Sequence, residues 1–192
     1  GTSAGTPRMH LAADRYDVTT AWDAIWVRAH DGSERAFPTL GREGFRHIAT
    51  LVHDVECGLE PLVDNFSEVE HTPTTHALFG YRRDALPDLR VRVELAPEHV
   101  RVYNEGPQKP LPRLIERAFG LRSGDTFIDD WTVRFSPVHI VYDQGWRDPS
   151  DTPRAERIHL GVFFTPLDRD ETRMTTVVFS NRRASAFDAV LV

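Results

Sequence analysis

Two histidines, His71 and His76, lie five residues apart with Pro73 between them. Neutral imidazole is a common ligand of iron, zinc and copper, so the pair can hold a metal ion if the two rings converge. On a regular helix, positions five apart are about 140° out of phase, and the rings would point apart. Pro73 disfavours helix at Thr72, so we expect a helix to break just after His71 and His76 to turn back toward it.

Two polar residues precede the pair at helical spacing. Glu68 lies three residues before His71, so its carboxylate can accept a hydrogen bond from the imidazole N–H that faces away from a metal. Asn65 lies three residues further back, on the same expected face. Two histidines and one carboxylate form the facial triad of non-haem Fe(II) oxygenases, which leaves positions open for dioxygen or water. A solvent-facing histidine at a helix end is the alternative that the spacing leaves open.

The surrounding pattern predicts an α+β fold built on an antiparallel sheet of six or seven strands. Apolar residues at spacings of three and four predict a helix over residues 57–70, and a shorter helix over 111–120 ends at Gly120. Strands are expected over 16–28 (two, with a turn), 47–55, 91–103 (a hairpin), 126–135, 137–143, 157–165 and 172–180. The last two are apolar on both faces, which is typical of strands covered on both sides. We expect a long loop over 144–156.

Composition narrows the function classes. The chain has 192 residues, 40% of them hydrophobic, which is enough for one domain with a core. Its net charge of −6 argues against binding to the phosphate backbone of a nucleic acid. Cys57 is the only cysteine, so the chain forms no internal disulfide and no cysteine-based metal cluster. No apolar run is long enough for a membrane span, and we expect a soluble, cytoplasmic protein.

The pattern Asn-x-x-Glu-x-x-His-x-x-x-x-His over residues 65–76, with its lead-in LVDNF, resembles the catalytic-iron motif of Rieske non-haem iron oxygenases. The resemblance is to the vanillate demethylase-like and ring-hydroxylating branches of that family, where aspartate takes the place of Glu68. YDVTTAWDAIWVR and FPTLGREGF resemble the end of the family's Rieske domain and the crossover into its catalytic domain. HLGVFFTPLDRDETRMTTVVF resembles the two strands that close the catalytic sheet.

This resemblance implies a helix-grip (START/Bet v 1-like) fold, in which a curved antiparallel sheet wraps around a C-terminal helix. Residues 1–40 would be a remnant of a Rieske-type domain with its crossover, and residues 41–192 a non-haem iron catalytic domain, cut short at its C-terminus. His71 and His76 would be iron ligands. The third ligand would be Asp188, in the helix-like terminal stretch, or a residue beyond Val192.

By the same resemblance, Glu68 would pass electrons toward the iron from the cluster of a neighbouring subunit, and Asn65 would lie near the iron. The implied activity is hydroxylation or demethylation of a small aromatic or apolar organic substrate with O2. The cofactors would be one Fe(II) and a [2Fe–2S] Rieske cluster. The cluster motif, Cys-x-His with Cys-x-x-His, is absent from this chain, so the cluster would lie on a missing segment or a partner.

A ferredoxin or reductase would supply the electrons, and the family favours a homotrimer. The residues also leave open a second class of function. A helix-grip small-molecule binding protein could keep the histidines without redox activity.

Overall fold

The computed structural model describes residues 16–29, 37–184 and 188. The chain divides into two compact units, Gly1–Thr39 and Leu40–Val192. In the first unit, β1 (Tyr16–Ala21) and β2 (Ala24–Ala29) form an antiparallel hairpin, as the sequence predicted. Trp22 and Asp23 make its turn, both with positive φ.

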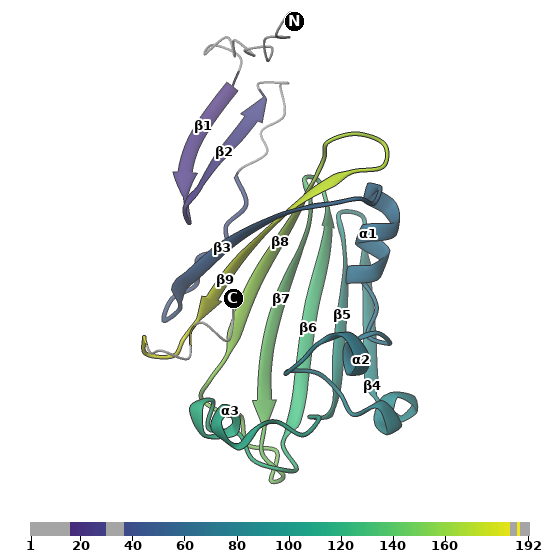
Figure 1. Cartoon of the computed structure of the whole chain (residues 1–192), viewed down its shortest axis with the longest axis vertical. Helices are drawn as coiled ribbons and strands as arrows, with labels where there is room; N and C mark the ends of the chain where they lie inside the picture. Colours follow the sequence, from purple (N-terminus) through teal and green to yellow (C-terminus); the bar gives the residue numbers. More distant parts are fainter. Residues whose placement is uncertain (1–15, 30–36, 185–187, 189–192) are drawn as a thin grey trace, which may run out of the picture. The chain divides into compact units, whose positions relative to one another are not determined.

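The second unit is built on one antiparallel sheet in the order β3-β9-β8-β7-β6-β5-β4 (Figure 1). Its strands are β3 (Arg46–Val55), β4 (Arg90–Ala96), β5 (His99–Pro107), β6 (Thr126–Phe135), β7 (Val138–Arg147), β8 (Ile158–Pro166) and β9 (Thr172–Ser180). All of these strands were expected from the sequence. The α+β class and the strand number are therefore confirmed.

Alternating side chains give this sheet two different faces. On β6, Phe127, Asp129, Trp131 and Val133 are buried, while the residues between them are less buried. We call the face that carries these four residues the inner face. The register places Gln144 of β7 directly opposite Asp129, so Gln144 shares that face.

Helices cover the inner face in two places. Leu62 of α1 (Leu59–Phe66) packs with Trp131, Tyr142 and Phe164 in one core cluster. A second cluster joins Ile115 of α3 (Arg113–Ala118) to residues at the other end of the sheet, including Tyr81, Phe127 and Trp146. The short α2 (Thr72–Thr75) and the 3-10 helix η2 (Arg83–Asp88) complete the elements of the described chain.

Strands β8 and β9 are buried on both faces, as predicted. They lie between the edge strand β3 and β7, which is the middle strand of the seven. On the outer face, Leu40 covers them. A Cβ added at Gly161 of β8 would lie 2.5 Å from Leu40 Cδ1, so glycine is required for this approach. Phe163 and Phe179 also alternate to this outer face and are buried there.

Three sequence expectations need correction or lie outside the described residues. The helix expected over 57–70 spans only Leu59–Phe66, because the chain turns after Phe66. The loop expected over 144–156 begins later, since β7 continues to Arg147. Most of the expected C-terminal helix falls in residues 185–187 and 189–192, outside the described range. No helix among the described residues is long and apolar enough to span a membrane.

Candidate metal centre

The end of α1 is fixed to the sheet next to the histidine segment. The Tyr142 hydroxyl on β7 donates a hydrogen bond of 2.6 Å to the carbonyl of Phe66, the last residue of α1. The Ser67 hydroxyl donates to the carbonyl of Val63 at 2.7 Å. Carbonyls at a helix end have no partner within the helix, and these two hydroxyls satisfy two of them. The turn toward His71 therefore starts from a fixed point.

Helix α2 brings the two histidines together, by a route that differs from the expected one. We predicted that Pro73 would end a long helix just after His71. Instead, Pro73 lies in the first turn of α2, where its missing N–H removes no hydrogen bond. His71 and His76 are the residues that flank this single turn, and Thr74 donates its hydroxyl to the His71 carbonyl at 2.9 Å.

Contacts from outside the segment hold α2 in place. Thr72 is buried against Gly80, where an added Cβ would lie 2.4 Å from Thr72 Cγ2, so any larger residue at 80 would displace the helix. Lys109, the only lysine of the sequence, donates from Nζ to the carbonyl of His76 and, at 3.5 Å, to that of Thr72. Carbonyl groups at the end of a helix favour a cation there.

The two imidazoles converge. His71 Nε2 and His76 Nε2 are 3.2 Å apart, with the ring centroids at 5.1 Å and the ring planes at 59°. On the other side of its ring, His71 Nδ1 lies 3.3 Å from Glu68 Oε1. A carboxylate only accepts hydrogen bonds, so it selects the tautomer with the proton on Nδ1 and leaves the Nε2 lone pair of His71 facing His76.

This geometry fits two ligands of one metal ion. With metal–nitrogen bonds of about 2.1 Å, two ligands at right angles hold their nitrogens about 3.0 Å apart. The observed separation of 3.2 Å is close to that value. Without a metal, His76 Nε2–H can donate to the lone pair of His71, and a bound metal ion would replace that proton.

The surroundings of His76 favour its neutral form. Partial burial lowers the pKa of His76, and the positive charge of Lys109 lowers it further, as does that of His71 when its ring is protonated. Neutral imidazole is the form that binds metals. His76 therefore stays competent as a ligand to a lower pH than an ordinary histidine.

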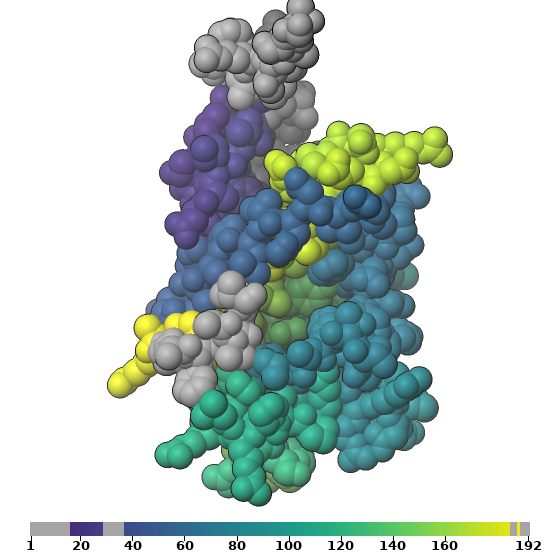
Figure 2. Space-filling model, viewed as in Figure 1, coloured from purple at the N-terminus to yellow at the C-terminus, as the bar shows by residue number. Residues whose placement is uncertain are grey.

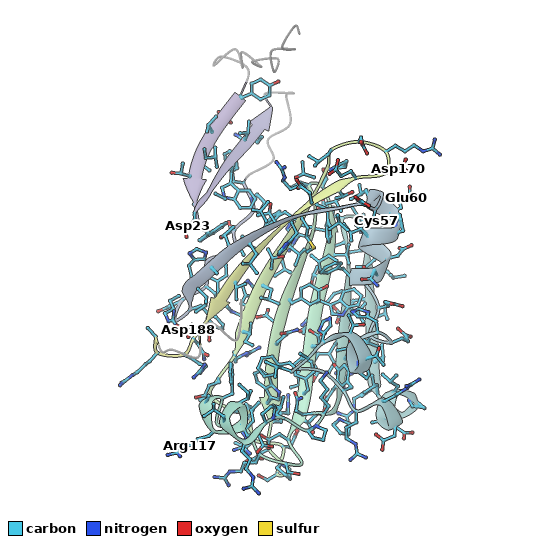
Figure 3. The ribbon with its side chains drawn as sticks, viewed as in Figure 1. Asp23, Cys57, Glu60, Arg117, Asp170 and Asp188 are labelled. Carbon is cyan, nitrogen blue, oxygen red and sulfur yellow. The ribbon has the colours of Figure 1, made fainter. Side chains whose placement is uncertain are left out.

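The other predicted site residues are placed differently. Asp188 pairs with Arg46 at the start of β3, Nη2 to Oδ2 at 2.5 Å, and Figure 3 shows it beside the end of β9, away from α2. Among the described residues, no three His, Cys, Asp or Glu side chains are grouped to hold a metal ion. Asn65 is exposed on α1 and, within the described chain, has no hydrogen bond to either histidine.

A cavity of about 310 Å³ lies beside His76. Its walls are mostly apolar, and Gln144 is its other strongly polar side chain. The lining consists of His76, Ala77, Leu78, Phe79, Gln144, Ile158, Leu160 and Val178. Figure 2 shows the sheet, in green, at the bottom of a hollow next to the blue-teal atoms of the α2 segment. Apolar walls with a few placed polar groups are typical of small-molecule sites.

The sequence analysis did not identify Gln144 as a site residue. Gln144 donates from Nε2 to Asp129 Oδ1 at 3.1 Å, and Asn104 Nδ2 lies 3.4 Å from the Asp129 carbonyl. These three residues form a cross-strand row on the inner face, which we call the polar row. Burial raises the pKa of Asp129 to about 7, and the adjacent charge of Asp130 adds to the shift.

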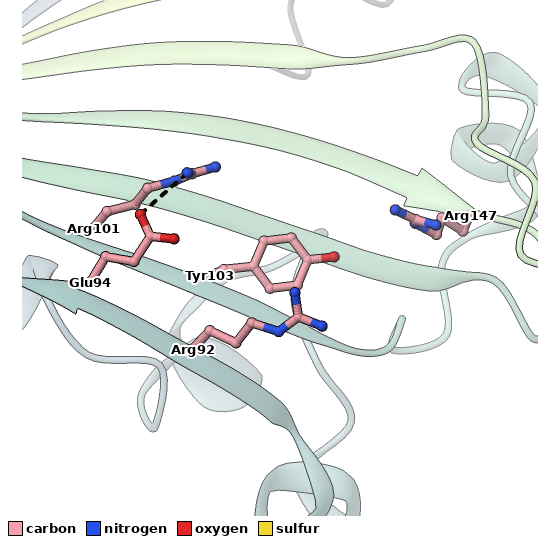
Figure 4. A pocket seen from close by; sticks show the side chains of 5 residues that line it. All are labelled: Arg92, Glu94, Arg101, Tyr103 and Arg147. Carbon is pink, nitrogen blue, oxygen red and sulfur yellow. Dashed lines mark ion pairs between the residues drawn. The ribbon is translucent and has the colours of Figure 1, made fainter.

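A second cavity, of about 260 Å³, lies on the outer face of the sheet (Figure 4). It is lined by Arg92, Glu94, Arg101, Tyr103 and Arg147. Arg101 is already paired with Asp130 at 2.7 Å and with Glu94 at 3.5 Å. Arg147 pairs with Asp151 at 3.1 Å. Two of the three arginines in this outer cavity, Arg101 and Arg147, are therefore neutralised by carboxylates.

No protein-family model matches the sequence, and no curated protein matches it. Solved structures do match. Dicamba monooxygenase bound to 3,6-dichlorosalicylic acid aligns with a TM-score of 0.74 at 16% identity, over 92% of this chain and 54% of the other. Dicamba monooxygenase with non-heme iron and dicamba aligns with a TM-score of 0.64 at 15% identity, over 92% and 52%.

A mutant of NdmA from Pseudomonas putida CBB5, solved with caffeine, aligns with a TM-score of 0.59 at 12% identity, over 92% of this chain and 47% of the other. The chain thus spans about half the length of the proteins it matches. At these identities the similarity establishes the fold: this chain is folded like the corresponding part of dicamba monooxygenase and NdmA.

Proposed function

We propose that this chain is the catalytic part of a Rieske-type non-haem Fe(II) oxygenase, which hydroxylates or demethylates a small, mostly apolar organic substrate. The observation that carries the proposal is the pair of imidazole nitrogens, His71 Nε2 and His76 Nε2, at 3.2 Å beside an apolar cavity. Fe(II) bound there would supply the capacity to activate dioxygen. The fold shared with dicamba monooxygenase and NdmA supports this assignment.

The residues of the chain have distinct roles in this proposal. His71 and His76 hold the metal, and Glu68 fixes the tautomer of His71. The walls of the cavity exclude water and orient the substrate next to the metal. The Glu68 side chain contacts His71 and is also 44% exposed, so a partner protein in solvent can reach it. We assign it the position where electrons arrive from a partner.

A carboxylate would complete the facial triad. The Asp188 carboxylate forms an ion pair with Arg46 at 2.5 Å. For Asp188 to be the third ligand, this ion pair must break so that the carboxylate can bind the metal. We therefore propose Asp188 as the third ligand only with a rearrangement that breaks this pair. The proposal also includes a [2Fe–2S] cluster on another segment or chain, a ferredoxin or reductase as donor, a homotrimeric assembly and a cytoplasmic location.

Iron binding tests the proposal directly. The 192-residue chain is loaded anaerobically with Fe(II), desalted, and assayed for iron per chain. We expect about one iron in the unaltered chain and loss of at least 100-fold in affinity in His71→Ala and in His76→Ala. The control is His53→Ala, which removes an exposed histidine of β3. Asp188→Asn reports on the third ligand.

The outcomes separate the possibilities. Iron retained in both histidine variants would refute the metal site. Iron lost in Asp188→Asn as well would support the rearranged ligand set, whereas iron retained there would remove Asp188 from it. Circular dichroism of each variant shows whether lost iron reflects lost ligands or lost folding.

A binding protein without redox activity is the second candidate. The cavity favours it, because seven of its eight lining residues are not metal ligands and their packing forms a binding site without iron. The two candidates differ in one measurement. A chain that binds an apolar ligand but takes up no iron would be a binding protein.

A further inference from the structure

The polar row places a hydrogen-bonding amide in an otherwise apolar wall. Gln144 lines the cavity together with Ile158, Leu160 and Val178. Among the described residues, Asp129 is the only hydrogen-bond partner of the Gln144 side chain. A polar group in an apolar wall costs free energy unless it is bonded, so a ligand that displaces water from the cavity must itself offer a partner to the half-buried amide.

Asp129 determines which end of the amide faces that ligand. Above pH 7 the Asp129 carboxyl is ionised and only accepts hydrogen bonds, so Gln144 directs Nε2 toward it. The carbonyl oxygen Oε1 is then left for the cavity. Asp129 is only 7% exposed and is further fixed through Asn104, which bonds to its carbonyl. The amide is thus oriented by two neighbouring strands.

We propose that Gln144, oriented by Asp129, selects substrates that carry a hydroxyl or N–H group on a small apolar ring. The donor group bonds to Gln144 Oε1, and the ring packs on the aliphatic wall beside His76. In this arrangement Gln144 contacts the substrate, and Asp129 is a positioning residue. The inference rests on the proposed function for its use of His76, but it concerns binding, which does not require iron.

The test uses two ligands of nearly equal shape, p-cresol and p-xylene, which differ by a hydroxyl in place of a methyl group. Their affinities for the 192-residue chain are measured by isothermal titration calorimetry at pH 8, above the pKa of about 7 for Asp129. We expect p-cresol to bind about tenfold more tightly than p-xylene. Gln144→Met, which keeps the length but removes the amide, should reduce this ratio to within about twofold.

Two further variants make the result specific. Asp129→Ala keeps Gln144 but removes the hydrogen bond that orients its amide. It should lower the affinity ratio of p-cresol to p-xylene to about threefold and leave the affinity for p-xylene unchanged. Asp130→Ala removes the adjacent carboxylate on the outer face and should leave the ratio at about tenfold. Gln144→Leu replaces Gln144→Met if the latter does not fold.

Several results would overturn the inference. These are equal affinity of the two ligands for the unaltered chain, a ratio that survives in Gln144→Met, and no binding of either ligand. Iron content is measured on the same samples. A chain that holds iron but fails to prefer p-cresol refutes the role of Gln144 and leaves the metal site standing, while the preference without iron refutes the oxygenase and supports the binding role.

Discussion

The two cavities lie on opposite faces of the same sheet and treat charge in opposite ways. On the outer face, Arg101 and Asp130 form an ion pair in which the arginine side chain is 45% exposed. On the inner face, Asp129 is buried, and in the described part of the chain Gln144 is the only side chain that bonds to its carboxyl group. Asp129 and Asp130 are adjacent in sequence, and the alternation of a β-strand alone separates them.

The difference shows on which face of the sheet a single interaction can strongly affect binding or stability. Water and counter-ions screen the outer charges, so each pair contributes little to stability or binding. The inner groups are desolvated, so a single missing or added hydrogen bond has a large effect. Asp129 and Asn104 of the polar row are buried on this face, whereas His76 lines the cavity of this face but is itself exposed.

The largest effect should come from Asp129. Burial raises its pKa from an ordinary value of 3.8 to about 7, so the folded chain keeps a proton that the unfolded chain releases. The contribution of the neutral carboxyl to stability is present at low pH and is lost as the pH rises through about 7. Between pH 5 and pH 8, the free energy of unfolding of the unaltered chain should fall by about 3 kcal/mol more than that of Asp129→Asn.

Urea unfolding at the two pH values measures this difference. The matched control is Asp130→Asn, which alters the carboxylate on the outer face that pairs with Arg101. It should keep the steep pH dependence of the unaltered chain. Parallel behaviour of Asp129→Asn and the unaltered chain would contradict the assignment of Asp129 to a desolvated face.

The next effect concerns Glu68, which contacts His71 Nδ1 at 3.3 Å. Removal of a carboxylate that orients a ligand histidine typically lowers metal affinity by about 10- to 100-fold. We expect Glu68→Ala to lose Fe(II) affinity by that factor, and Glu68→Gln, which keeps an acceptor oxygen, to lose less. Anaerobic competition with a chelator measures both.

Glu70→Ala is the control for Glu68. Glu70 is close in sequence and equally acidic, but its carboxylate accepts from the backbone N–H of Val69 at 3.0 Å. Its loss should leave iron affinity unchanged. An equal effect of the two alanine variants would mean that net charge, rather than the orientation of His71, controls binding.

The strands of the sheet were predictable because the alternation of apolar and polar residues is visible within each short segment of the sequence. Period-two alternation marks Val91, Val93 and Leu95 as one face of a strand, and the structure has β4 there. The convergence of His71 and His76 was also predicted, from the proline between them. The prediction had the wrong mechanism, however, since helix propensity alone does not reveal that the chain turns at Phe66, where Tyr142 bonds to it.

The cavity was harder to predict because its residues are distant in sequence. Gln144 was assigned to the start of a long loop with two prolines, yet pairing with β6 extends β7 through it. In the structure, Asp129 alternates with Phe127 and Trp131 on the inner face. Its pairing with Gln144 depends on register between two strands, which this sequence alone does not specify.

The smallest effect should come from the outer face, and it tests the comparison from the other side. Arg101 meets Asp130 through two hydrogen bonds, Nε to Oδ1 at 2.9 Å and Nη2 to Oδ2 at 2.7 Å. Even this good geometry is exposed, so a double-mutant cycle of Arg101→Gln and Asp130→Asn should give a coupling of about 1 kcal/mol or less. The coupling should decline further in about 1 M salt, where screening acts within about 3 Å. A coupling that is large and insensitive to salt would place Asp130 in a desolvated environment like that of Asp129. The inner and outer faces would then not differ in their electrostatic screening, although their side chains differ in exposure.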